Sequence, residues 1–308
     1  MSSEWRTGNT ALFGCIGVNK SETTMDFKSA FKERLLDALC FTTDFFDAHQ
    51  LRWWVAYGTA IGAVRHKGLI PWDDDIDLFM PYEDYQRLLQ LEDAFVGTGY
   101  GLSMPLQDGN PCTYAKIIDE NTTVLESPEL KYVAGVWIDI FPLYATDVDE
   151  AGFDLLSKQY FRKWKRCQRG DYHSKDWKTP KACVKRLQEL LFFRPLHDWF
   201  CKDFLRFEKD LHVDGGKKRM FPFSYSRCCN LFDADWFRES VKMEFEGMEV
   251  KLPVGYDSLL RQLYGDYMTP PPVENQTSTH GSYYINLKER IDLREIERRV
   301  KKGEHCVW

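Results

Sequence analysis

The chain has 308 residues and a mass of 36.2 kDa, with 44% hydrophobic and 29% charged residues, so it can bury the core of one large domain with an added lobe. Its net charge of −6 argues against a general nucleic-acid-binding protein, because such proteins carry a basic surface. Its apolar runs are shorter than the roughly 20 residues of a membrane-spanning helix, and residues 1–24 lack the basic leader of a secretory signal, so we expect a cytoplasmic protein that begins with a flexible segment.

Cysteine usage gives no sign of a disulfide framework. The nine cysteines are an odd number, scattered without C-x-x-C pairs. Adjacent Cys228 and Cys229 could contribute to a zinc site with distant partners, but their spacing favours packed or surface thiols. We therefore expect reduced thiols and no structural zinc.

The first predicted element covers residues 25–50. Phe27, Phe31, Leu35 and Leu39 recur at the spacing of one helix face, which is typical of an amphipathic helix. We expect this helix to pack behind the sheet of a catalytic core that spans residues 25–148.

A strand, a turn and a helix start are predicted next. Residues 52–57 are rich in aromatic and branched side chains, which favours a strand, and Gly58 and Thr59 interrupt it before an apolar segment at 60–64. Free backbone N–H groups at a helix start, beside a threonine hydroxyl, suit a phosphate oxygen. Gly58 and Thr59 are therefore candidate phosphate-binding residues, although a glycine turn alone is a common feature.

The following predicted strand carries a pair of acids. Aliphatic residues occupy every second position from 76 to 80, and a period of two places Asp75 and Asp77 on one face. Two neighbouring carboxylates stay ionised only with a cation between them, and Mg²⁺ (or Mn²⁺) takes oxygen ligands. Asp75 and Asp77 are therefore candidate catalytic and metal-binding residues, whereas Asp73 and Asp74 have a simpler interpretation as solvated loop acids.

A phosphate turn followed by a paired-acid strand is what metal-assisted phosphoryl or nucleotidyl transfer needs. The segment GTAIGAVRHKG at 58–68, followed by IPWDDDID at 70–77, resembles the LicD family, which includes bacterial phosphocholine transferases and fukutin-type ribitol-phosphate transferases. This resemblance implies an α+β fold with a polymerase-β-like nucleotidyltransferase core, a small mixed sheet flanked by helices. In that core the Gly-Thr turn holds phosphate, the Asp-x-Asp pair binds metal, and a third acid lies on a neighbouring strand.

A lone cation, Lys116, lies in the strand predicted at 113–119, which precedes an apolar run at 122–125. One interpretation is an edge lysine whose ammonium group reaches solvent. The LicD family has a similar lysine here, and this resemblance favours a substrate-facing role.

Asp139 is the single acid of the apolar strand predicted at 136–143. A carboxylate in so apolar a run is unfavourable unless it is paired or metal-bound. A satisfied core aspartate is the alternative, but the resemblance places Asp139 as the third carboxylate, either a metal ligand or a general base.

Residues 149–215 are predicted to form a basic helical lobe beside the core. Over 158–186 the only acids are Asp171 and Asp176, among many lysines and arginines. A solvated helix face is the simplest interpretation. The alternative is a dock for an anionic acceptor polymer or for acidic lipid headgroups, since each basic residue near such a surface adds about 1 kcal/mol. This alternative would place the protein peripherally at the inner membrane face.

Residues 216–308 are expected to complete the catalytic domain. The pattern predicts a hairpin at 243–250 and a short helix at 256–264, which prolines at 270–272 close. This block is again similar to the LicD family, so the resemblance covers residues 25–280 apart from the less characteristic lobe. His280 lies at its end, and a lone histidine is more often a surface residue than a catalyst.

The resemblance also implies the reaction. An acceptor hydroxyl would attack the distal phosphorus of a CDP-activated alcohol, and the phospho-alcohol would pass to a glycan or lipid-linked glycan while CMP leaves. Arg65, His66 and Lys67 would add positive charge at the phosphates. Phosphocholine, from CDP-choline, has the strongest family precedent, and Trp72 could bind its quaternary ammonium by cation–π attraction. Relatives that transfer ribitol phosphate also carry a tryptophan here, so ribitol or glycerol phosphate stays open.

Two other classes remain as alternatives. A nucleotidyltransferase in the narrower sense would use a nucleoside triphosphate and release pyrophosphate. A non-catalytic glycan- or choline-binding protein could keep the same fold, but the intact Asp75, Asp77 and Asp139 argue against lost catalysis.

Overall fold

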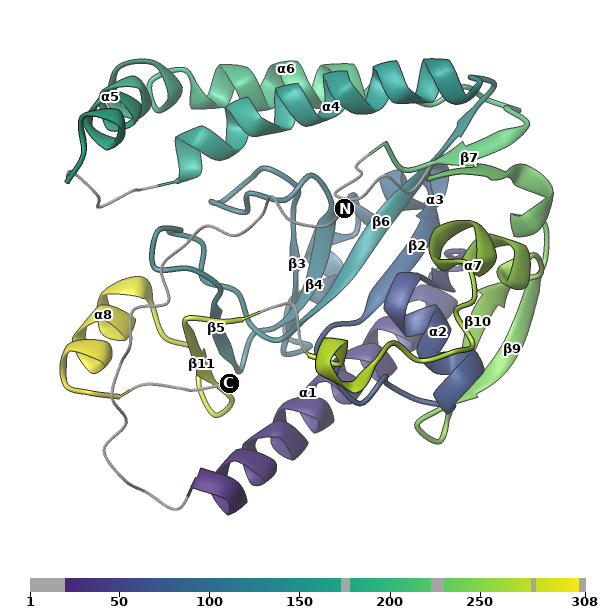
Figure 1. The fold of residues 1–308 in the computed structure, drawn as a ribbon, viewed down its shortest axis with the longest axis horizontal. Helices are drawn as coiled ribbons and strands as arrows, with labels where there is room; N and C mark the ends of the chain where they lie inside the picture. The colour runs from purple at the N-terminus through teal and green to yellow at the C-terminus, as the bar shows by residue number, and fades with distance from the viewer. Residues whose placement is uncertain (1–19, 173–177, 223–229, 278–280, 305–308) are drawn as a thin grey trace.

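The protein has a mixed α+β architecture in its computed structural model, which describes residues 20–172, 178–222, 230–277 and 281–304 (Figure 1). Its centre is a mixed sheet in the order β1-β2-β6-β4-β3, to which β7 and β8 are joined through β6. Strands β2 and β6 run parallel, and the other neighbouring strands run antiparallel. The strands of this sheet are β1 (Trp54–Val55), β2 (Asp77–Pro81), β3 (Tyr100–Ser103), β4 (Ala115–Asp119), β6 (Trp137–Thr146), β7 (Lys218–Met220) and β8 (Leu231–Asp233).

Helix α1 (Lys20–Ala48) supports this sheet by packing against β4 and β6. Leu35, Leu39 and Phe46 are buried on it, as the predicted amphipathic pattern requires. The helix predicted at 25–50 is therefore confirmed. Helix α2 (Tyr57–His66) precedes β2 and helix α3 (Tyr82–Leu88) follows it, and a 3₁₀ turn η1 (Glu92–Phe95) comes after α3.

The C-terminal part returns to the core. The predicted hairpin is β9 (Ser240–Phe245) and β10 (Met248–Pro253), and the predicted helix is α7 (Tyr256–Tyr264). Glu246 and Gly247 form the hairpin turn with φ of 51° and 80°, which suits the twist of a two-residue loop. The remaining elements are the 3₁₀ turns η3 (Ala234–Phe237) and η4 (Val273–Asn275), helix α8 (Leu293–Lys301), and the pair β5 (Thr123–Leu125) and β11 (Tyr284–Asn286).

The segment predicted as a helical lobe consists of α4 (Glu150–Asp171), α5 (Pro180–Gln188), a π-helical turn η2 (Glu189–Phe193) and α6 (His197–Lys209). Figure 1 shows α4 and α6 side by side along one edge of the molecule, with α5 at their far end. Phe153, Tyr160 and Trp164 of α4 are buried, and the Trp164 indole donates a hydrogen bond to the Pro111 carbonyl at 2.9 Å. The lobe is thus packed onto the core, and the domain boundaries predicted at 24, 148 and 215 stay predictions.

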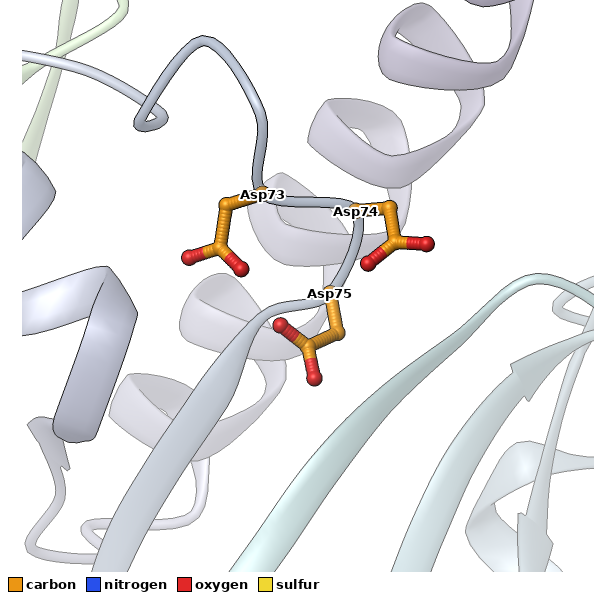
Figure 2. Close-up of side chains that lie close together, drawn as sticks. All are labelled: Asp73, Asp74 and Asp75. Atoms are coloured by element: carbon orange, nitrogen blue, oxygen red, sulfur yellow. The ribbon is translucent and has the colours of Figure 1, made fainter. Parts of the chain in front are cut away.

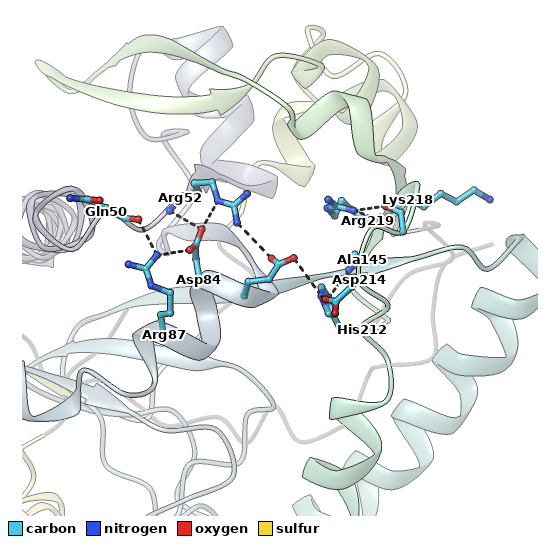
Figure 3. Close-up of polar contacts among 11 residues, drawn as sticks. Gln50, Arg52, Asp84, Arg87, Ala145, His212, Asp214, Lys218 and Arg219 are labelled. Carbon is cyan, nitrogen blue, oxygen red and sulfur yellow. Dashed lines mark hydrogen bonds and ion pairs between the residues drawn. The ribbon is translucent and has the colours of Figure 1, made fainter.

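The strand predicted at 52–57 is shorter than expected. Arg52 precedes it, and Oδ2 of the buried Asp84 carboxylate accepts from both the Arg52 backbone N–H at 3.2 Å and the guanidinium Nε at 2.6 Å. Arg87 donates to the other oxygen of Asp84 at 2.9 Å (Figure 3). At the other end, Tyr57 takes φ of 43° and begins α2, so Gly58 and Thr59 lie in the first helical turn instead of before it.

Among the described residues, no helix combines the length and apolar character that crossing a bilayer requires. Of the described cysteines, Cys40, Cys112, Cys167, Cys183 and Cys201 are not in disulfides, and the reduced state of the protein stays a prediction. The adjacent Cys228 and Cys229, and also His280, lie outside the described residues.

A buried acid in the lobe gives a testable pH dependence. Glu208 of α6 accepts a hydrogen bond from the Tyr144 hydroxyl, and burial raises its pKa to about 7. Between pH 4.5 and 7 the folded state therefore holds a proton that the unfolded state has released, so the free energy of unfolding falls by about 3 kcal/mol as pH rises through this window. Glu208→Gln should remove this slope and stabilise the protein at pH 8.

Urea denaturation of both proteins across pH 5 to 8 would measure the effect. The exposed Glu92→Gln is the matched control and should keep the wild-type slope. An unchanged slope in Glu208→Gln would show that Glu208 is ionised throughout this range.

Candidate active site

Strands β2 and β6 place two acids side by side. Their parallel register pairs Asp77 with Asp139, so the two side chains leave the same face of neighbouring strands. The pairing already starts one residue earlier, where the Asp139 N–H donates to the Ile76 carbonyl at 3.0 Å. The sequence patterns predicted an acid on each strand, and the structure joins these acids at one point of the sheet.

The start of α2 is tied to this point. The Asp77 N–H donates to Thr59 Oγ1 at 3.0 Å, and the Ala56 N–H donates to the Asp77 carbonyl at 2.8 Å. Thr59 is buried, so its hydroxyl fixes the helix start against β2. Phosphate binding by Gly58 and Thr59 stays a prediction.

Gly58 allows an acid to approach the first turn of α2. A β-carbon on Gly58 would lie 2.4 Å from Asp73 Oδ2, closer than any side chain tolerates. This contact brings the loop before β2 onto the helix N-terminus. Any larger residue at position 58 would have to displace the Asp73 side chain.

Three consecutive acids form a cluster on that loop. Asp73, Asp74 and Asp75 are half-buried, and one carboxylate oxygen of each lies within 4.8 Å of the others (Figure 2). Asp75 precedes β2 instead of belonging to it, which differs from the predicted Asp75–Asp77 strand pair, because the strand begins at Asp77. Asp73 and Asp74 were missed as candidates by sequence reasoning, although the run of three aspartates was their signal. Grouped carboxylate oxygens fit a hard divalent cation such as Mg²⁺.

Lys116 forms a buried ion pair with Asp139. Its Nζ lies 2.9 Å from Asp139 Oδ1, and the two side chains are 3% and 8% exposed. Burial raises the pKa of Asp139, the Lys116 charge opposes this rise, and the nearby Asp75 charge adds to it. Burial works to lower the pKa of Lys116, but Asp139 together with Cys112, Glu126 and Tyr132 outweighs it and leaves that pKa well above its ordinary value. The interpretation of Lys116 as a solvent-reaching edge lysine is therefore wrong.

Trp137 is a site residue that sequence reasoning missed. It lies two residues before Asp139 on the same face of β6, and the Lys116 ammonium sits 4.2 Å from its ring centroid. Its indole Nε1 is buried without a hydrogen-bond acceptor in the described part of the chain. The two-residue spacing from Asp139 was the available signal.

The basic residues at 65–67 lie at the opposite end of α2 from Gly58. Arg65 Nη1 donates to the Tyr267 carbonyl, and Lys67 Nζ lies 3.4 Å from Glu244 Oε2. Burial, together with the Arg65 charge, lowers the pKa of His66. These contacts direct Arg65 and Lys67 toward the C-terminal part, and their action on donor phosphates stays a prediction.

Trp72 borders a cavity beside the acidic cluster. The cavity has a volume of about 580 Å³, and the His66 ring lies 6.2 Å from the Trp72 ring. Its walls come from α1, from the loop before β2 and from the segment after η4, and they include Lys28, Phe31, Lys32, Asp73, Asp74 and Gln276. The cavity is therefore a candidate space for part of a substrate that the acids would hold.

Fold and site together define an α+β protein with a carboxylate-rich centre where a turn, a helix start and two parallel strands meet. Residues 50–196 match the family described as LicD/FKTN/FKRP, nucleotidyltransferase domain. Residues 50–196 thus match the LicD family, and the resemblance recognised from the sequence is confirmed for this segment.

Relatives with assigned names agree with this family. A lipopolysaccharide cholinephosphotransferase, LicD of Haemophilus influenzae, is 28% identical over 261 residues, which cover 77% of this chain and 91% of the relative. The ribitol 5-phosphate transferase FKRP of Homo sapiens is 32% identical over 111 residues, 30% of this chain and 22% of the relative. By their names, both are transferases of a phospho-alcohol group.

Proposed function

We propose that this chain transfers a phospho-alcohol group, with phosphocholine as the first candidate, from a CDP-activated donor to a hydroxyl of a glycan or lipid-linked glycan. The observation that carries the proposal is the meeting of Asp77 and Asp139 on paired strands, beside the Asp73–Asp75 cluster, within the segment that matches the LicD family. A buried ion pair of Asp139 with Lys116 could also be purely structural, but its position beside the acidic cluster supports a role in the reaction.

The acids are the residues that would hold Mg²⁺ or Mn²⁺. Asp75 and Asp77 remain the first candidates, and Asp73 and Asp74 join them because their oxygens lie within 4.8 Å of those of Asp75. When bound, the cation supplies charge neutralisation at the donor diphosphate. The first turn of α2 presents its backbone N–H groups near the same loop, and they would orient a phosphate oxygen.

Asp139 is proposed as the proton acceptor. The acceptor hydroxyl attacks the distal phosphorus and gives its proton to Asp139, a new P–O bond forms, and the bond to CMP breaks with its electrons leaving on CMP. Burial raises the pKa of Asp139 and so makes its carboxylate a stronger base, while the Lys116 charge opposes this rise and favours the ionised form that accepts the proton. Lys116 then acts as a positioning residue for Asp139.

The alcohol could occupy the cavity beside Trp72. An aromatic ring next to the carboxylates of Asp73 and Asp74 offers cation–π and charge attraction to a quaternary ammonium group. Lys32 lines the same cavity, but its charge is paired with Glu246 at 2.8 Å. These features support choline over the uncharged ribitol and glycerol, which remain the alternatives.

A second candidate is nucleotidyl transfer from a nucleoside triphosphate, which the description of the matching family as a nucleotidyltransferase domain favours. A polymerase-β-like core would serve either reaction. The two differ in their products, because nucleotidyl transfer releases pyrophosphate and phospho-alcohol transfer releases CMP.

Thermal unfolding with CDP-choline, CDP-ribitol, CDP-glycerol, CTP and ATP, each with and without Mg²⁺, tests the proposal. A ligand at about a hundred times its dissociation constant should add roughly 2.7 kcal/mol to the free energy of unfolding. A Mg²⁺-dependent gain with one CDP-alcohol, weaker in Asp77→Asn, is the expected result and names the alcohol. A gain with the triphosphates alone would replace the proposal with nucleotidyl transfer, and no gain with any of them would reject both.

A further inference from the structure

The far end of the lobe exposes a group of large apolar side chains. We call it the tip surface and define it by Val184, Leu187, Leu191, Phe192, Leu196 and Trp199. Leu191, Phe192 and Trp199 are 66%, 59% and 58% exposed, although side chains of this kind are normally buried. Figure 1 shows this end of the lobe, around α5, as the part farthest along α4 and α6 from β7.

The exposure follows from how the helices pack. Val184, Leu187 and Leu191 recur at the spacing of one helix face, yet α5 buries none of its side chains. The neighbouring aromatics turn inward instead: the Phe193 and Phe200 rings lie 5.8 Å apart, and the Arg169 guanidinium lies 4.8 Å from the Phe193 ring. The interior of the lobe is thus packed by these side chains, and the side chains of the tip surface face outward.

The charge around the tip surface is positive. Between residues 178 and 202 the basic residues are Lys178, Lys181, Lys185, Arg186, Arg194 and Lys202, and the acids are Glu189 and Asp198. Glu189 is 1% exposed and lies 3.9 Å from the Lys185 ammonium, so these two charges offset each other. A chain with a net charge of −6 therefore concentrates positive charge around one exposed apolar group.

We propose that the tip surface docks onto a lipid bilayer that contains anionic headgroups. Trp199, Phe192 and Leu191 would enter the boundary between headgroups and acyl chains, and the exposed Lys181, Lys185 and Lys202 would contact lipid phosphates. This combination of an apolar face with aromatic residues and a basic rim is the pattern of helices that lie in a membrane interface. A second copy of the chain fits less well, because it would bring two basic rims together.

The contribution of each part can be estimated. Each basic residue near an anionic surface strengthens the attraction, which is screened within about 10 Å at 0.1 M salt. Apolar insertion adds to it without dependence on salt. Binding should therefore need both the apolar residues and the anionic lipid, and it should weaken as salt is raised. This inference does not depend on the proposed reaction.

Co-sedimentation of the full chain with vesicles tests the inference. The vesicles are phosphatidylcholine alone, or phosphatidylcholine with an equal amount of phosphatidylglycerol. We expect binding only to the anionic vesicles, and a loss of at least about tenfold in the double variant Leu191→Ser with Phe192→Ser. The matched control is Val96→Ser with Val273→Ser, which removes two side chains of 83% and 79% exposure elsewhere on the surface and should bind like wild type.

A charge variant separates the two contributions. Lys181→Glu with Lys202→Glu should weaken binding to the anionic vesicles while the thermal midpoint of the protein is kept. No binding of wild type to anionic vesicles, or equal losses in the tip variant and its control, would overturn the proposal. A dimer in solution that the tip variant dissociates would assign the surface to a second copy instead.

Discussion

Asp77→Asn is expected to lower the rate of CMP release from the CDP-alcohol by about a hundred- to a thousand-fold, the loss typical when one group that stabilises transition-state charge is removed. Asparagine keeps the size of the side chain and removes the negative charge that a cation would need. The backbone contacts of residue 77 with Thr59 and Ala56 do not involve its side chain, so the fold should be retained.

Steady-state assays of CMP release, run beside urea denaturation, would separate lost activity from lost stability. The exposed Asp93→Asn is the matched control, since it makes the same chemical change on η1. Wild-type activity in Asp77→Asn would remove Asp77 from the metal-binding set and leave the Asp73–Asp75 cluster as the candidate. Calorimetric titration of wild type and Asp75→Asn with Mg²⁺ would then test that cluster.

The positions of the site residues along the chain could be predicted from the sequence, because each motif had a local signal. Asp77 and Asp139 each interrupt an apolar strand, and a carboxylate in that position is unfavourable unless it is paired or bound to a cation. Their adjacency could not be derived from local pattern, because it depends on the register of two strands separated by α3, β3, β4 and β5. The resemblance to a family supplied this link.

The predicted ends of secondary-structure elements were wrong where tertiary contacts determine them. Asp75 was placed in the strand by alternation, but the chain reaches β6 only at Ile76, so Asp75 stays with the loop acids. Lys116 gave no sign of its burial, because its partner Asp139 lies on another strand. The tip surface differs from Lys116, because its residues are exposed although their spacing resembles that of a core-facing helix. Only the structure shows that α5 buries none of its side chains.

Breaking the buried pair between Lys116 and Asp139 should give the largest loss of stability. Lys116→Met leaves the Asp139 carboxylate buried without its counter-ion, and Asp139→Asn leaves the Lys116 ammonium in the same position. Removal of one partner of a buried pair typically lowers the free energy of unfolding by about 3–5 kcal/mol. The exposed pair of Lys158 with Asp154 provides the control, since Lys158→Met should leave the denaturation midpoint nearly unchanged.

The double variant Lys116→Met with Asp139→Leu separates a structural role from a chemical one. It removes both buried charges together and replaces them with apolar side chains of similar volume, so urea denaturation should show most of the lost stability restored. Its CMP release should stay at the level of Asp139→Asn, because the proposed proton acceptor is absent in both. If the double variant regained activity together with stability, Asp139 would be a core residue paired with Lys116, and proton transfer would have to be assigned to another acid of the site.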